Sequence, residues 1–194
     1  LRKFGIEAEQ AEKAFTSLRT GLSQFITLDK TTQMSLAKTI SGLETLGVSG
    51  DDSVSVINSL NKSFGMGVKA SAKLTRQIAL SGKALGMTAS KITKEYKESL
   101  KILGVYGEDS VKIFTNIAAM AQAAGVQIST LTGLASKFDT FSDAADTAGK
   151  LNSILGSTMS ATEMLMMTED QRIETLIETV NSQGKSFREM DRFT

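Results

Sequence analysis

The nonapeptide LGVSGDDSV (Leu46–Val54) recurs 57 residues later as LGVYGEDSV (Leu103–Val111), and each copy carries two glycines and two acidic residues. Two interpretations compete. Glycine beside aspartate can form a loop that holds a phosphate or a metal ion. The same residues can also separate two helices, because glycine adopts the left-handed conformation that closes a helix and carboxylates stabilise the start of the next one.

The surrounding sequence favours the second interpretation. No strand pattern precedes either copy, and neither copy carries GxGxxG, GK[ST] or calcium-loop spacing. We therefore expect Gly47 to end a helix and Asp51 and Asp52 to lie in the first turn of the following one, with Gly104, Glu108 and Asp109 repeating this arrangement. Looser apolar–Gly patterns occur at Phe64–Gly67, Leu85–Thr88, Ala124–Gln127 and Leu155–Thr158. The 57-residue offset suggests a degenerate repeat of about two helices per copy.

Apolar residues recur at helical spacing along nearly the whole chain, which predicts an all-α fold of short to medium helices arranged as hairpins or a bundle. Near the start they form a heptad-like seam that suits a coiled coil, made of Ala11, Phe15, Leu18, Leu22 and Phe25. Polar residues then interrupt the seam. One helix from about Ile6 to Leu46 and two helices separated at Asp29 both fit, and we favour the break.

These patterns suggest three regions: an amphipathic segment at 1–47, a helical-hairpin region at 48–156 and a C-terminal helical segment at 157–194. The C-terminal segment also carries local signals. Capping boxes that predict helix starts occur at Ser160–Glu163, Thr168–Gln171 and Ser186–Glu189. The stretch Lys137–Asp146 is expected to contain a turn in which Ser142 caps the next helix. The methionine-rich run Glu163–Met167 is interpreted as packing, with a flexible binding surface as the alternative.

The composition limits the chemistry that the chain can perform. Among its 194 residues there is no His, Cys, Pro or Trp, so disulfides and the commonest metal ligands and nucleophile–base pairs are missing. Paired carboxylates occur at Asp51/Asp52, Glu108/Asp109, Asp143/Asp146 and Glu169/Asp170. Because these pairs fall at expected helix starts, we interpret them as caps and expect no catalytic residue, no cofactor and no metal site.

Charge is unevenly distributed. Residues 1–104 hold 15 Lys and Arg against 9 Asp and Glu, whereas residues 105–194 hold 7 against 12. The most basic stretch runs from Lys62 to Lys101 and includes only two acids, Glu95 and Glu98. A solvated helix face explains it, and contact with nucleic acid or another polyanion is the alternative. No apolar run is long enough for a membrane span.

The stretch Leu85–Gly156, which opens with LGMTASKITKEY and contains LGVYGEDSV and AGVQ, resembles the tail tape measure proteins of tailed bacteriophages. The resemblance implies several copies inside the tail tube of the virion, assembled in the host cytoplasm, whose length sets the length of the tube. It also implies contacts with the tube and with the tail tip or baseplate hub.

The chain opens on Leu1 and closes with REMDRFT inside a helical pattern, so we expect it to be part of a longer protein. Two other classes stay open. One is a bacterial helical adaptor or signalling segment. The other is a peptidoglycan-degrading enzyme segment, for which no catalytic carboxylate stands out.

Overall fold

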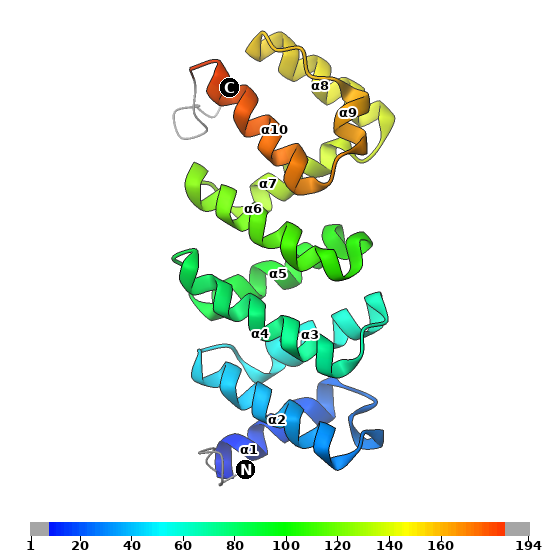
Figure 1. The fold of residues 1–194 in the computed structure, drawn as a ribbon, viewed down its shortest axis with the longest axis vertical. Helices are drawn as coiled ribbons and strands as arrows, with labels where there is room; N and C mark the ends of the chain where they lie inside the picture. The colour runs from blue at the N-terminus through cyan, green and yellow to red at the C-terminus, as the bar shows by residue number, and fades with distance from the viewer. Residues whose placement is uncertain (1–7, 185–194) are drawn as a thin grey trace. The chain divides into compact units, whose positions relative to one another are not determined.

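The computed structural model describes residues 8–184, and every regular element in that range is helical (Figure 1). The all-α prediction is therefore confirmed. The chain divides into two compact units, unit 1 at Leu1–Val111 and unit 2 at Lys112–Thr194. Their boundary falls inside the expected helical-hairpin region 48–156. The helices before residue 47 share their core with the helices that follow.

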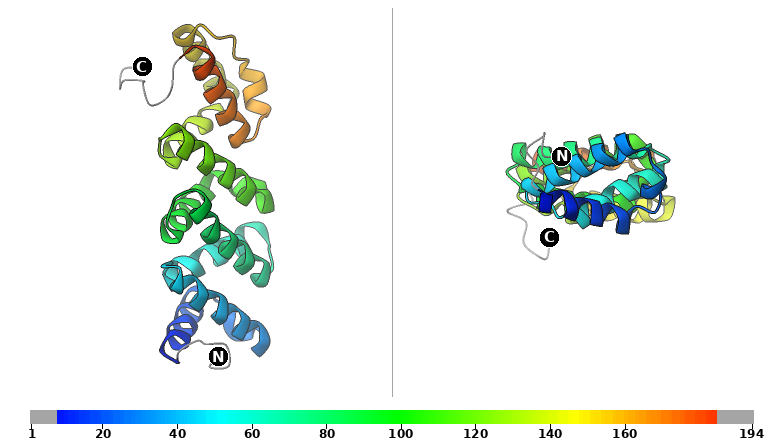
Figure 2. Two further views of the ribbon diagram at one scale, coloured as in Figure 1. Left: turned by 60° about the vertical axis from the view of Figure 1, so that its left-hand side comes forward. Right: turned by 90° about the horizontal axis from the view of Figure 1, so that it is seen from below.

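Successive helices of unit 1 stack on one another. Its described α-helices are α1 (Ala8–Gly21), α2 (Lys30–Thr45), α3 (Gly50–Phe64), α4 (Val68–Ala84) and α5 (Ala89–Leu103), with 3-10 helices η2 (Phe25–Thr27) and η3 (Gly104–Asp109). Each α-helix packs against the next in the chain, and α1 also contacts α3, α2 contacts α4, and α3 contacts α5. Odd and even helices therefore lie in two layers, which can be followed in Figure 2.

The predicted N-terminal seam builds the core of unit 1. Leu18, Leu22 and Phe25 are buried together with Val54 and Ile57 of α3. Because these side chains are covered by α2, α3 and α4 of the same chain, the expected coiled-coil segment is not formed as a separate element. The apolar face instead contributes to a shared core, where burial of each large side chain stabilises the fold by roughly 1.5–3 kcal/mol.

The interruption at Asp29 is a helix start, as we favoured. The side chain of Asp29 accepts a hydrogen bond from the backbone N–H of Thr32 at 2.9 Å, and Asp29 is therefore the N-cap of α2. Hydrogen bonds from Thr32 lower the pKa of the Asp29 carboxyl below its usual range, and the nearby charge of Lys69 adds a smaller effect in the same direction. One continuous helix from Ile6 to Leu46 is therefore excluded over its described part.

The first nonapeptide ends α2 as predicted. Gly47 has φ of 85°, its N–H donates to the carbonyl oxygen of Glu44, and the N–H of Val48 donates to that of Leu43. This pair of bonds is the Schellman arrangement that satisfies the last carbonyls of a helix. Ser49 then caps α3 by accepting from the N–H of Asp52 at 3.1 Å.

The second nonapeptide behaves differently, so the expected repetition of this arrangement was wrong. Gly104 is right-handed, with φ of −59°, and the chain continues into η3. The left-handed residue is Gly107, with φ of 55°. The two copies differ where Ser49 corresponds to Tyr106, and a tyrosine cannot cap a helix as a short hydroxyl side chain does. The next helix consequently begins later, at Ser110.

The count of helices per repeat also needs correction. Three helices, α3, α4 and α5, lie between the two nonapeptides, whereas we expected two. Each helix with its connection therefore takes about 19 residues, which is close to the mean helix length plus a short loop. The four looser patterns do end helices, at the positive-φ residues Gly65, Gly86, Gly125 and Gly156.

Unit 2 contains shorter elements. They are α6 (Ser110–Ala124), which crosses the boundary, α7 (Ile128–Ala135), η4 (Ser136–Phe138), α8 (Phe141–Leu155), α9 (Ala161–Met166) and α10 (Glu169–Ser182). Within the unit, α7 packs against α10 and α8 packs against α9 and η4. The core is formed by Phe138, Ala144, Ala148, Met164 and Leu176.

The helix starts of unit 2 test the predicted caps. The box at Thr168–Gln171 is confirmed, with both of its bonds present and Gln171 accepting from the N–H of Thr168 at 3.0 Å. At Ser160–Glu163 the predicted helix start is confirmed, because Ser160 accepts from the N–H of Glu163 as the N-cap of α9. The box at Ser186–Glu189 lies outside the described residues. The cap of α8 is Thr140 rather than Ser142, because the Thr140 hydroxyl accepts from the N–H of Asp143 and α8 has already begun at Phe141.

The described residues include no single helix that is both long and apolar enough to cross a bilayer. A broken pair, Ala89–Ala124 with Ile128–Phe138, meets the length and composition requirement together but is bent by 116°.

Candidate functional site

The carboxylate pair of the first nonapeptide fixes helices to one another. Asp51 accepts a hydrogen bond from the Ser17 hydroxyl of α1 at 2.8 Å. Asp52 lies 3.4 Å from the ammonium of Lys97 and 4.0 Å from that of Lys94, both on α5. The pair therefore ties the start of α3 to α1 on one side and to α5 on the other.

In the pairs of unit 2, Asp143 and Asp146 have partners close in the sequence, whereas Asp170 is bonded to a residue of another helix. Asp143 accepts from the Thr140 hydroxyl, and Asp146 forms an ion pair with Lys150 at 2.6 Å. Asp170 accepts from the side-chain amide of Asn116 at 2.8 Å. Glu169 is 3 % exposed, and its Oε2 has no hydrogen-bond partner. The remaining pair, Glu108 and Asp109, lies exposed in η3 of unit 1.

Two features limit the chemistry of the described residues. Among residues 8–184 there is no group of three or more acidic side chains that could hold a metal ion. A groove of about 430 Å³ runs between the loop after α8 and helix α10, and its lining includes the hydroxyl side chains of Ser160, Thr175 and Thr179 with the carboxylate of Glu163. His, the side chain that most often activates a hydroxyl nucleophile, is absent from the chain.

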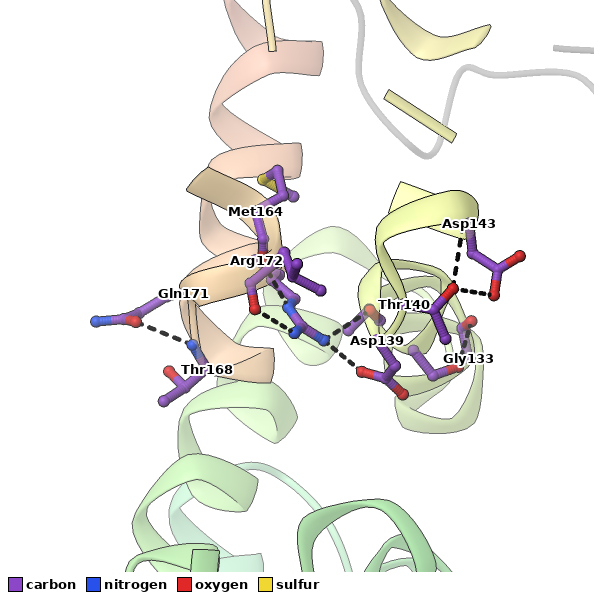
Figure 3. A network of polar contacts seen from close by, with 11 residues as sticks. Gly133, Asp139, Thr140, Asp143, Met164, Thr168, Gln171 and Arg172 are labelled. Carbon is purple, nitrogen blue, oxygen red and sulfur yellow. Dashed lines mark hydrogen bonds and ion pairs between the residues drawn. The ribbon is translucent and has the colours of Figure 1, made fainter. Parts of the chain in front are cut away.

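Arg172 organises unit 2, and our sequence analysis did not identify it. Its side chain is 5 % exposed and points into the space between α7, α9 and the η4 turn (Figure 3). The guanidinium donates to the carbonyl oxygens of Met164, Leu165 and Ala135 and to the Asp139 carboxylate at 2.6 Å.

Three of these acceptors are carbonyls in the last turns of α7 and α9, where the helix dipole favours a cation. The Arg172 network is therefore a structural clamp. Its only sequence signal is an arginine directly beside the apolar stripe of α10.

The basic stretch Lys62–Lys101 does not form one face. Lys94 and Lys97 of α5 turn toward Asp52, whereas the cations of α4 point outward. The exposed cations of α4, here called the basic stripe, are Lys69, Lys73, Arg76 and Lys83. At 3.6 residues per turn they fall within an arc of about 80°.

The basic stripe has no acidic neighbour on its own helix, since no Asp or Glu occurs between Asp52 and Glu95. Among the described residues Lys73, Arg76 and Lys83 form no ion pair. Leu80, 49 % exposed, lies within the same arc. Lys69 lies near the carboxylate of Asp29, so the uncompensated positive charges of the stripe are those of Lys73, Arg76 and Lys83, with an apolar residue among them.

Unit 2 carries the opposite arrangement on α10. Glu174 and Glu178 are exposed one turn apart, and Asp170 lies one turn before them; we call these three residues the acidic stripe. The only cation of α10, Arg172, is buried in its clamp, so it does not neutralise them. Glu174 and Glu178 form no ion pair among residues 8–184.

The fold defines the class of this protein as all-α, with a unit of successively stacked short helices followed by a second, smaller helical unit. Comparisons with known protein families, with curated proteins and with solved structures found no match to this chain.

Proposed function

We propose that this chain is a structural segment of a phage tail tape measure protein, packed in the tail tube or against the tail tip, and that it contributes to tail length and assembly. Support comes first from the resemblance of Leu85–Gly156 to that family. It comes also from the all-α fold, in which short helices are ended at glycines.

The observation that carries the proposal is the use made of the polar groups. Asp51 and Asp52 hold the start of α3 against α1 and α5, Asp143 belongs to the cap of α8, and Asp146 forms an ion pair within α8. Side chains used in this way serve packing, which is what a protein that acts through its length and shape requires.

The stacking of unit 1 gives the proposal a quantitative form. A continuous helix rises 1.5 Å per residue, so residues 50–88, which comprise α3 and α4 with their connections, would span roughly 60 Å when extended. In a two-layered stack the same pair of helices advances the structure by about one interhelical distance, roughly 10 Å. A change in tail length therefore shows whether this segment helps to set the length of the tail. The size of the change shows whether its helices are stacked or extended.

The experiment inserts three further copies of residues 50–88 after Thr88 in the parent gene, and tail lengths are measured by electron microscopy. Stacked copies lengthen the tail by roughly 30 Å and extended copies by roughly 180 Å. Gly42→Ala, which leaves the number of residues unchanged, is the control. Tails of unchanged length with the insertion, or clearing of peptidoglycan by the purified chain, would contradict the proposal.

A further inference from the structure

We infer that the basic stripe of one copy binds the acidic stripe of a second copy, so that the chain associates head to tail. The inference rests on the proposed function in one respect, namely that several copies of the chain lie close to one another. Its basis is the charge pattern of the two helices α4 and α10.

The first step is the electrostatic repulsion within the basic stripe, which destabilises α4 in an isolated chain. Lys73 and Arg76 are neighbours on the α4 surface, and like charges at this spacing destabilise a helix. Elsewhere in the described part of unit 1 some cations have a carboxylate partner, as Lys13 has Glu9 and Lys97 has Asp52, whereas the stripe gathers its cations on one face of a helix that has no acid. The uncompensated charges on α4 are therefore suited to an anionic partner outside the helix.

The second step is the choice of partner. Phosphate backbones offer no apolar contact, yet Leu80 lies half-exposed inside the stripe between Arg76 and Lys83. A protein surface can cover this leucine while its carboxylates meet the cations, as at interfaces with an apolar centre and a polar rim. The stripe therefore favours an acidic protein surface over a nucleic acid.

The third step identifies such a surface on the same chain. Residues 8–111 hold 13 Lys and Arg against 10 Asp and Glu, whereas residues 112–184 hold 4 against 8. The exposed carboxylates of Glu174 and Glu178 lie one turn apart, which matches the spacing of Lys69 and Lys73. Because the two surfaces differ, their pairing is heterologous and generates rings or filaments instead of a symmetric dimer.

Sedimentation velocity of the 194-residue chain tests this inference. We expect association at 50 mM salt that weakens at 300 mM, because exposed ion pairs are screened. Lys73→Glu with Arg76→Glu (variant A) and Glu174→Lys with Glu178→Lys (variant B) should each weaken association by about 10- to 100-fold, the effect of losing several exposed pairs and adding repulsion.

The decisive measurement is an equimolar mixture of the two variants. Variant A leaves the α4 stripe with two acids beside Lys69 and Lys83, and variant B leaves the α10 stripe with two lysines beside Asp170, so neither variant alone has complementary stripes. In the mixture the unchanged acidic stripe of variant A meets the unchanged basic stripe of variant B, and the reversed charges of the two substituted stripes face one another, so association should be restored. Lys91→Glu with Lys101→Glu changes the net charge as variant A does, but on exposed positions of α5, and should leave association unchanged. Circular dichroism checks that all variants fold.

Each other outcome overturns the inference. These outcomes are a monomeric wild-type chain at 50 mM salt, undiminished association of variant A or B, and failure of the mixture to associate. Binding of duplex DNA by a monomeric wild-type chain, lost in variant A, would assign the stripe to nucleic acid instead. Tails of unchanged length in the insertion experiment would refute the proposed function and leave the sedimentation result standing.

Discussion

Gly47 and Gly104 hold the same place in two nearly identical nonapeptides, yet Gly47 is left-handed with φ of 85° and Gly104 is right-handed with φ of −59°. The difference follows from the residue two positions later. Ser49 caps a new helix at once, whereas Tyr106 does not, and the chain continues through η3 before its left-handed residue at Gly107.

We therefore predict opposite effects of alanine at these two glycines. Gly47→Ala should destabilise unit 1 by about 1–2 kcal/mol, because a left-handed residue with a Cβ is strained. Gly104→Ala should be neutral or stabilise slightly, since its backbone is already helical and its Cβ would lie 3.5 Å from Phe64, an ordinary contact. Urea denaturation of both variants measures the difference, and equal midpoints would contradict it.

A second pair of glycines tests close packing. A Cβ on Gly82 of α4 would lie 2.9 Å from the Ile92 side chain and 3.0 Å from the carbonyl oxygen of Met87, whereas a Cβ on Gly42 of α2 would meet nothing within 4 Å. We expect Gly82→Ala to cost about 1–3 kcal/mol of unfolding free energy through overpacking.

Gly42→Ala, the control, should add roughly 0.5–1 kcal/mol through helix propensity. Thermal melts of the two variants should shift in opposite directions. A stabilising Gly82→Ala would mean that α4 and the start of α5 are less closely packed than the structure indicates.

The Arg172 clamp gives a third prediction. Arg172→Met should destabilise unit 2 by about 3 kcal/mol, because buried carbonyls of α7 and α9 lose their donor. Asp139→Asn should cost less than about 1 kcal/mol, since this carboxylate is 49 % exposed and supplies only one of the four acceptors.

Hydrogen exchange should register the Arg172→Met change in α7, α9 and α10. A larger effect at Asp139 than at Arg172 would show that the ion pair, rather than the carbonyl contacts, holds these helices.

The pH dependence of unit 1 should depend on Tyr96. Its hydroxyl lies 2.9 Å from that of Ser110, both residues are buried, and burial raises the pKa of Tyr96 to about 12, with the Ser110 hydrogen bond opposing the shift. A tyrosine whose pKa is raised on folding contributes stability below the unfolded value of about 10, and this contribution is lost as pH rises toward 12.

The loss amounts to about 2–3 kcal/mol, at 1.36 kcal/mol per pKa unit. Tyr96→Phe removes the titrating group, so its stability should decline less between pH 10 and 12 than that of the wild-type chain. Tyr106→Phe serves as the control, and chemical denaturation across this pH range makes the comparison. Parallel declines in wild type and Tyr96→Phe would contradict the prediction.

Local features of this fold were predictable from the sequence because they depend on neighbours in the chain. The caps at Asp29, Ser49, Ser160 and Thr168 and the left-handed stop at Gly47 each need only a short side chain or a glycine within one turn of a helix end. The same holds for helix periodicity, and so for the all-α class.

Tertiary structure alone decided what each helix faces. The N-terminal seam suits a partner helix in a coiled coil and equally a core, and only the positions of α3 and α4 against Leu18 and Leu22 choose between them. Likewise, the basic stretch Lys62–Lys101 does not form a single charged surface. Lys97 contacts Asp52, 45 residues away in the sequence, whereas Lys73 and Arg76 are exposed. Periodicity specifies which residues share a face of a helix, but the covering of that face depends on contacts between residues distant in sequence.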